Sequence, residues 1–324
     1  MKPIIFVCGH RKGGTSMFHN LFDGHNDVSV YPVDLNILYG YFPQFTQNSY
    51  SVEQLKERLN RVIFEDLQTI PALQGKVNFR AFKSLFYEKV SQHNLNDIDL
   101  VMTSLLESYS ETHTKNNYFK YHLFKETSIE LYAQELAEKF PNGKFLHLIR
   151  DPRDNFASIS SGLDTKYQGY GDSKNSLMFS MINRALYGFK MAAINKQLLG
   201  ENRYKVVRFE DLASNPKSVM TDVCQWLEIP YQDCLTIPSI FGEVNQGNNF
   251  EDIKFNNVSS ENVGRWRERI STADAALIEL MFKEEMLTFD YQLQSSDAEK
   301  ANSIGEFYKW MNYKYLYHDR FTSE

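Results

Sequence analysis

Four short apolar segments are spaced along the chain, and stretches with helical periodicity separate them. Each segment is rich in Ile, Val, Leu, Phe or Tyr, the residue types that favour strands. Strands that alternate with helices in this way assemble into a parallel sheet with helices on its faces. The pattern therefore predicts an α/β fold with strands over 3–8, 119–124, 143–149 and 204–208.

Helices are predicted where apolar residues recur every three or four positions. The segment 127–140 has this repeat, and Thr127 followed by Glu130 predicts a capping box at its start. The same periodicity predicts a long crossover helix over 172–199 and further helices over 215–227 and 272–288.

Two other regions are expected to be helical without carrying chemistry of their own. The segment 41–116 is predicted to be an insertion of the kind that shapes a substrate cleft, and the aromatic tail, 298–324, a terminal helix. Repeats, low-complexity tracts and linkers are absent from the sequence. We therefore predict a single domain over residues 1–324.

Composition and charge limit the partners that the chain can have. With 324 residues and 42% apolar content, the chain can bury a full core. Its formal net charge of -6 gives no general attraction to nucleic acid, so we expect no such partner. Any site for an anionic ligand must therefore be local.

The sequence also bears on location. The apolar start, 3–8, is too short for a signal peptide, and no stretch approaches 18 apolar residues, so we expect no membrane span. Cys8, Cys224 and Cys234 have neither metal-ligand nor disulfide spacing. We expect a cytoplasmic protein in a reducing compartment, and a homo-oligomer is compatible with the sequence.

The most informative motif is GHRKGGTS over residues 9–16, between the first strand and a helical pattern. In a strand, glycine turn and helix arrangement, backbone N–H groups face an anion, typically a phosphate or sulfate. A purely structural turn is the alternative. The candidate anion-binding residues are Arg11, Lys12, Gly13, Gly14, Thr15 and Ser16.

The position of the lysine separates this loop from that of nucleotide triphosphatases. Those enzymes carry a lysine directly after the last glycine and then a hydroxyl residue that holds magnesium. Here Thr15 follows Gly14, and the lysine lies within the loop as Lys12. We therefore expect no metal, although a nucleotide kinase stays open as an alternative.

A second element offers another phosphate site. Arg150 follows a predicted strand, and Ser158 comes eight residues later. A guanidinium fork and a hydroxyl can both bind one phosphate. The alternative is a surface arginine that pairs with Asp151 at the start of the next helix.

These motifs resemble those of sulfotransferases that use 3′-phosphoadenosine 5′-phosphosulfate (PAPS). The loop 9–16 is similar to their phosphosulfate loop, and Arg150 with Ser158 to their 3′-phosphate site. The segments 206–212 and 263–267 also look like family segments. The resemblance implies a P-loop-like three-layer sandwich, with PAPS as donor, adenosine 3′,5′-bisphosphate (PAP) as product and no metal.

The resemblance also implies roles for single residues. Arg265 and Trp266 match a late loop that closes over the nucleotide, and Lys125 matches a lysine that steadies the transferred group. Phe209 departs from the tyrosine that many relatives use to fix the adenine.

The catalytic base would be a carboxylate after the loop helix, which in this chain is Asp34. The alternative is that Asp34 only caps a helix starting near Leu35. His122 is a weaker candidate for the base, three residues before Lys125.

We therefore expect transfer of a sulfuryl group to a hydroxyl of an acceptor, with a saccharide or glycoconjugate favoured because the loop and base fit the glycan branch. A tyrosyl-protein or small-metabolite acceptor, a kinase, and a nucleotide-sensing scaffold without turnover are the alternatives.

Overall fold

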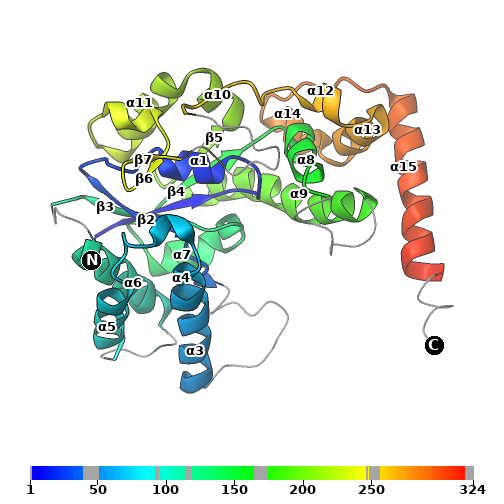
Figure 1. Cartoon of the computed structure of the whole chain (residues 1–324). Coiled ribbons are helices and arrows are strands. Elements are labelled where there is room, and N and C mark those ends of the chain that lie inside the picture. The colour runs from blue at the N-terminus through cyan, green and yellow to red at the C-terminus, as the bar shows by residue number, and fades with distance from the viewer. Residues whose placement is uncertain are drawn as a thin grey trace.

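The computed structural model of the chain describes residues 2–38, 51–91, 95, 97–113, 118–163, 174–245, 247 and 256–317. In this part of the chain, a sheet of five parallel strands has the order β2-β3-β1-β4-β5 (Figure 1). The strands are β1 (Ile4–Cys8), β2 (Val28–Asp34), β3 (Tyr121–Lys125), β4 (Lys144–Ile149) and β5 (Tyr204–Arg208). The predicted α/β fold with a central parallel sheet is confirmed.

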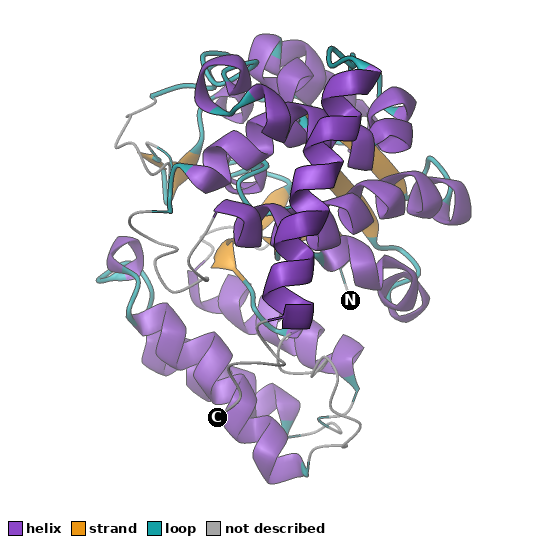
Figure 2. Ribbon diagram, turned by 90° about the vertical axis from the view of Figure 1, so that its right-hand side faces the viewer, coloured by secondary structure: helices purple, strands orange, loops and turns teal. Residues whose placement is uncertain are grey.

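Helices cover both faces of the sheet because successive residues of a strand point to opposite sides. On β1, Ile4 and Phe6 pack into the apolar cluster that includes the helices between β2 and β4. Ile5 and Val7 face the other way and pack with α1 (Thr15–Asn20) and α11 (Pro216–Leu227). Figure 2 shows the strands between these helical layers.

The region predicted as a helical insertion forms α3 (Val52–Leu59), α4 (Asp66–Gln68), α5 (Phe79–Val90) and α6 (Ile98–His113), with a π-helical turn at Asn60–Glu65 and a 3-10 turn at Pro71–Leu73. Residues 41–50, 92–94, 96 and 114–116 of that prediction lie outside the described part. Tyr31 of β2 packs edge-on against Phe82 of α5 and Tyr109 of α6. These ring contacts fix the helices beside the edge strand of the sheet.

The rest of the chain supplies the remaining helices. They are α7 (Ala133–Lys139), α8 (Pro152–Ser160), α9 (Lys174–Leu199), α10 (Phe209–Ser214), α12 (Trp266–Arg269), α13 (Thr272–Met281), α14 (Lys283–Thr288) and α15 (Asp297–Met311), with 3-10 turns at Ile129–Tyr132 and Asp233–Thr236 and a π-helical turn at Asn312–Tyr317. A short hairpin joins β6 (Ser239–Ile240) to β7 (Glu243–Val244). Of the predicted tail, residues 318–324 lie outside the described part.

No helix within the described residues combines the length and the apolar character needed to cross a membrane.

Two sequence-based predictions of local structure need correction. The strand β2 was not predicted, because Pro32 and Asp34 interrupt its apolar run. The predicted capping box at Thr127 and Glu130 does not form: the 3-10 turn there has no side-chain cap, and the buried Glu130 carboxylate instead accepts a hydrogen bond from the Gly9 N–H.

Candidate functional site

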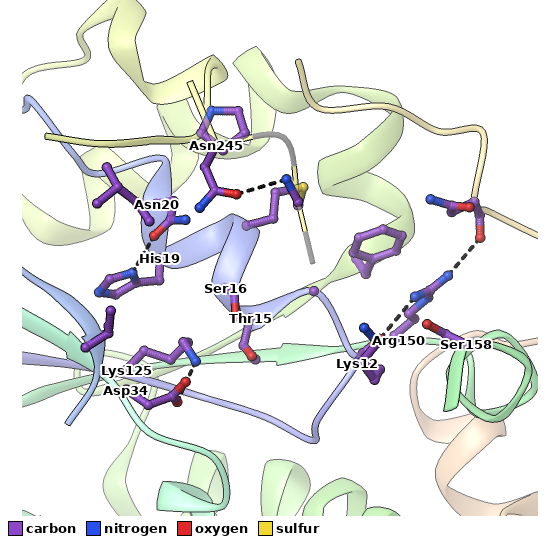
Figure 3. A pocket seen from close by; sticks show the side chains of 18 of the residues that line it. Lys12, Thr15, Ser16, His19, Asn20, Asp34, Lys125, Arg150, Ser158 and Asn245 are labelled. Carbon is purple, nitrogen blue, oxygen red and sulfur yellow. Dashed lines mark hydrogen bonds and ion pairs between the residues drawn. The ribbon is translucent and has the colours of Figure 1, made fainter. Parts of the chain in front are cut away.

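A cavity of about 470 Å³ opens at the carboxyl ends of the strands, the edge of open α/β sheets where ligands bind. Its lining includes eight of the residues singled out from the sequence: Lys12, Gly14, Thr15, Ser16, Asp34, Lys125, Arg150 and Ser158. Figure 3 shows two groups among them, with Lys12, Arg150 and Ser158 at one end and Asp34 and Lys125 at the other. Thr15 and Ser16 lie between the two ends.

The glycines of the 9–16 loop are required by its backbone. Gly9 has a φ of 137° and Gly14 a φ of 96°, angles that side chains with a Cβ rarely adopt. A Cβ on Gly9 would lie 2.3 Å from the carbonyl oxygen of Leu148, and one on Gly14 would lie 2.6 Å from the Phe209 ring. The loop therefore turns tightly against β4 and the start of α10.

Polar contacts hold the loop from behind. Asn155 of α8 pairs with the His10 ring through its side-chain oxygen, 2.7 Å from Nδ1, and donates its N–H to the carbonyl of Arg11 at 2.9 Å. On the other side, the Glu130 carboxylate accepts the Gly9 N–H at 3.1 Å. The loop is thus positioned by α8 and by the segment after β3 before any ligand is bound.

Glu130 should give the protein a pH-dependent stability. Burial raises the pKa of its carboxyl from 4.5 to about 7, so the stability that the protonated group contributes is present below about pH 4.5 and is lost as the pH rises through 7. At roughly 1.4 kcal/mol per pKa unit, the loss reaches about 3 kcal/mol at pH 8.

The substitution Glu130→Gln should remove this loss while keeping an oxygen that accepts the Gly9 N–H. Urea unfolding of both proteins at pH 5 and pH 8 measures it. An equal decrease in the free energy of unfolding for the two proteins would show that Glu130 does not titrate in this range.

Arg150 lies at the end of β4 and is almost fully buried. Its guanidinium donates to the carbonyls of Lys12 at 3.1 Å and Asn262 at 2.9 Å, and lies 4.5 Å from the centre of the Phe209 ring. Among the described residues, its Nε has no hydrogen-bond partner. Since Ser158 lines the same end of the cavity, the pair can offer N–H and O–H donors to one anion.

Lys12 adds a second positive charge at this end. Its backbone is in the left-handed region with a φ of 60°. Burial, followed by the neighbouring charge of Arg150, lowers the pKa of its ammonium from 10.5 to about 8. A bound anion would relieve the repulsion between the two cations, so this end of the cavity is suited to phosphate or sulfate.

The other end of the cavity is built by two neighbouring strands. Asp34 and Lys125 are register partners at the ends of β2 and β3, and Lys125 Nζ lies 2.5 Å from Asp34 Oδ1. The Lys125 side chain is 5% exposed and that of Asp34 is 40% exposed. Asp34 is therefore the partner that an incoming molecule can reach, and Lys125 keeps a positive charge beside it.

Some of the predicted site residues do not face the cavity. In the described lining, the side chains of Arg265 and Trp266 are absent: Arg265 donates to the Asn262 side chain, and Trp266 is buried under the guanidinium of Arg153. Arg269, at the end of α12, lines the cavity instead. The loop residues Arg11 and Gly13 are likewise outside the described lining, although they shape the loop that carries Lys12.

His122, the weaker candidate for a base, is placed away from the end of the cavity that holds Asp34. It lies in the amino-terminal half of β3, where it is buried and packs edge-on against Phe119. Burial, with a smaller effect from Lys2, lowers the pKa of its imidazole to about 3. It is not among the described residues that line the cavity.

Sequence reasoning missed His19 and Asn20, which line the cavity from the last turn of α1. The helical spacing could have indicated them, because they follow Thr15 and Ser16 by four positions and so lie on the same helix face. Burial and the charge of Lys125 lower the pKa of His19 to about 4, so its ring is neutral. Its Nδ1 lies 2.9 Å from the side-chain oxygen of Asn20.

A comparison with family models decides between the reactions that this anion site could serve. The model described as the sulfotransferase family matches residues 3–233, which include the loop, Asp34, Lys125, Arg150 and Ser158. The chain belongs to the sulfotransferase family. It is therefore a transferase of this class, and the alternative prediction of a nucleotide kinase is wrong. A search of curated proteins finds no match for this sulfotransferase.

Solved structures show the same fold at low sequence identity. The sulfotransferase domain from the Synechococcus PCC 7002 olefin synthase is 19% identical, with a TM-score of 0.61 over 90% of this chain and 96% of that one. The sulfotransferase domain from the curacin biosynthetic pathway is 16% identical, with a TM-score of 0.59 over 91% and 99% of the two chains.

Proposed function

We propose that this sulfotransferase transfers the sulfuryl group of PAPS to a hydroxyl of a saccharide or glycoconjugate and releases PAP. The observation that carries the proposal is one continuous cavity with two cations at one end and a reachable carboxylate at the other (Figure 3). Such an arrangement suits a reaction in which an anionic donor meets a hydroxyl that must lose its proton.

The donor would lie along the loop. Lys12 and the N–H groups around Gly14 to Ser16 would bind the phosphosulfate, and Arg150 with Ser158 would bind the 3′-phosphate. The Phe209 ring, stacked on Arg150, holds the guanidinium in place. These contacts use only charges and dipoles that the folded protein already positions.

In the transfer step, Asp34 accepts the proton of the acceptor hydroxyl as the hydroxyl oxygen attacks sulfur. The bond between sulfur and the bridging phosphate oxygen breaks, and Lys12 neutralises the charge that develops on that oxygen. Lys125 balances the carboxylate beside the transferred group. The products are the sulfated acceptor, PAP and a proton on Asp34 that returns to solvent.

A donor-binding experiment tests the proposal directly. PAP should raise the Tm of the protein without magnesium, and ATP with magnesium should not match it. Incubation with radiolabelled PAPS and a panel of saccharides, tyrosine peptides and small alcohols then identifies the acceptor. Stabilisation by PAP without transfer to any acceptor would favour a nucleotide-sensing role instead.

The substitution Arg150→Ala tests the 3′-phosphate site. It should weaken PAP binding by about 1.5 to 3 kcal/mol, the usual range for hydrogen bonds to charged groups. Because Arg150 also holds the Lys12 carbonyl, calorimetry should compare PAP with adenosine 5′-phosphosulfate, which has no 3′-phosphate. Equal weakening of both ligands would mean that Arg150 only supports the loop.

A further inference from the structure

A second cavity of about 470 Å³ adjoins the first on the side of the edge strand β2. The two cavities share His19, Asn20, Pro32 and Ile240 as lining residues. Pro32 is two residues before Asp34 on β2, so a molecule in the second cavity can place a hydroxyl near that carboxylate. Aromatic side chains of α6 and residues of the β6–β7 hairpin form its other walls.

The two cavities differ in charge. The first is lined by Lys12, Lys125, Arg150 and Arg269, against the carboxylate of Asp34. Among the described residues that line the second, lysine and arginine are absent, and Asp23 is present. Asp23 accepts hydrogen bonds from two uncharged groups, the Ser239 hydroxyl and the Gly242 N–H, so its negative charge stays at this wall.

Among the described residues, three histidines line the second cavity, and they do not supply the missing positive charge. The pKa of His19, lowered to about 4 by burial and the charge of Lys125, keeps its ring neutral. In His25, the Nε2–H donates to the Pro230 carbonyl, and Nδ1 accepts the Asp27 N–H. In His113, the Nδ1–H donates to the Tyr109 carbonyl, and Nε2 accepts the Asn78 N–H. Each of these two rings therefore has one donating and one accepting nitrogen, which is the neutral form.

The rest of the described lining contains both polar and aromatic groups. Asn20, Asn26 and Ser29 offer donors and acceptors, while Tyr109 and Phe241 offer ring surface. A molecule with hydroxyl groups on its edges and C–H groups on its faces, such as a sugar ring, matches both kinds of surface. A carboxylated or already sulfated acceptor would instead meet Asp23. Two described lysines lie against rings of this lining, but Lys2 donates to the Phe119 carbonyl and Lys76 pairs with Glu243.

We propose that this second cavity is the acceptor subsite and that it selects uncharged, hydroxyl-rich acceptors over anionic ones. The inference rests on the proposed function, because it needs the donor in the first cavity. It adds the class of acceptor and the surface that selects it. Donor and acceptor thus enter two compartments of opposite electrostatic character that adjoin at Pro32, two residues before Asp34.

A matched pair of probes tests the selection. p-Nitrophenyl β-glucoside and p-nitrophenyl β-glucuronide differ only in a hydroxymethyl group against a carboxylate. Their Kd values are measured by ligand-observed NMR with PAP present. We expect the glucoside to bind at least about 10-fold more tightly, since close like charges cost at least that much at an interface.

A charge-changing variant locates the effect in this cavity. Asn26 is exposed at the rim, and its main-chain N–H donates to the Gln232 side chain, a bond that a substitution keeps. Asn26→Lys should lower the preference for the glucoside at least about threefold. The control Asn183→Lys makes the same charge change on an exposed face of α9 and should leave the preference unchanged.

The outcomes distinguish failure of the proposed function from failure of the acceptor subsite. If calorimetry shows no PAP binding, the proposed function itself fails. If PAP binds, the acceptor subsite is refuted by binding of neither glycoside, by equal or tighter binding of the glucuronide, or by an Asn26→Lys protein with an unchanged preference.

Discussion

Replacing Lys12 with alanine should lower kcat/KM for PAPS by about 10²-fold or more, the usual cost of removing one preorganised group that stabilises developing charge. Lys12 lies at the cationic end of the cavity beside Arg150, and burial already lowers the pKa of its ammonium to about 8. In a partly buried site, a charge acts more strongly on its ligand than in water. The loop itself should persist, because Arg150 and Asn155 hold it through the main-chain carbonyls of Lys12 and Arg11.

Transfer of label from radiolabelled PAPS, with PAP affinity measured separately, checks this expectation. The control is Lys309→Ala, which removes a lysine whose side chain is 75% exposed on α15. The loss should appear mainly in kcat if Lys12 acts on the leaving oxygen, and mainly in PAP affinity if it only binds the donor. Unchanged transfer by Lys12→Ala would contradict the proposed mechanism.

The sequence allowed much of the sheet to be predicted because strands buried on both faces are continuous apolar runs. The segments 3–8 and 143–149 became β1 and β4 almost residue for residue. β2 was not predicted because Pro32 interrupts its apolar run. A proline cannot donate to a neighbouring strand, but it is tolerated here because β2 lies at the edge of the sheet. β5 lies at the other edge and also has a mixed sequence, but it contains no proline and was predicted.

The candidate site could be predicted where one segment carries both the backbone geometry and the charge. The loop around Lys12 is such a segment, since its glycines and its lysine are adjacent in sequence. The pairing of Asp34 with Lys125 depends instead on the order of β2 and β3 in the sheet, which no local pattern specifies. Without a predicted β2, their contact could not be derived.

Tertiary contacts also place two residues of the predicted motifs differently from what their local sequence suggests. Glu130 satisfies a local capping pattern, yet its carboxylate turns inward to the Gly9 N–H. Trp266 was expected at the nucleotide, but Asp154 accepts its main-chain N–H at 2.8 Å and Arg153 covers its ring. Both side chains pack into the frame around the site, and the sequence has no signal for these contacts.

Asp34→Asn should lower kcat by about 10²- to 10⁴-fold, the range that a positioned base contributes. The amide has nearly the same shape as the carboxylate but cannot accept the proton of the acceptor hydroxyl. PAP affinity should be unchanged or higher, because Lys125 loses the anion that lies 2.5 Å away and can interact more fully with the donor. Single-turnover transfer with radiolabelled PAPS and calorimetry with PAP measure the two effects, with Asp222→Asn on the exposed face of α11 as the control.

The same substitution separates catalysis from helix capping. Asparagine is as good a capping residue as aspartate, so a protein in which Asp34 only caps the segment after β2 would keep its full kcat as Asp34→Asn. Asp34→Glu supplies the complementary result: it restores a carboxylate at a longer reach and should recover part of the transfer rate. A fast Asn variant would therefore assign proton transfer to another group, whereas a slow Asn variant with partial recovery by Glu would identify the carboxylate itself as the base.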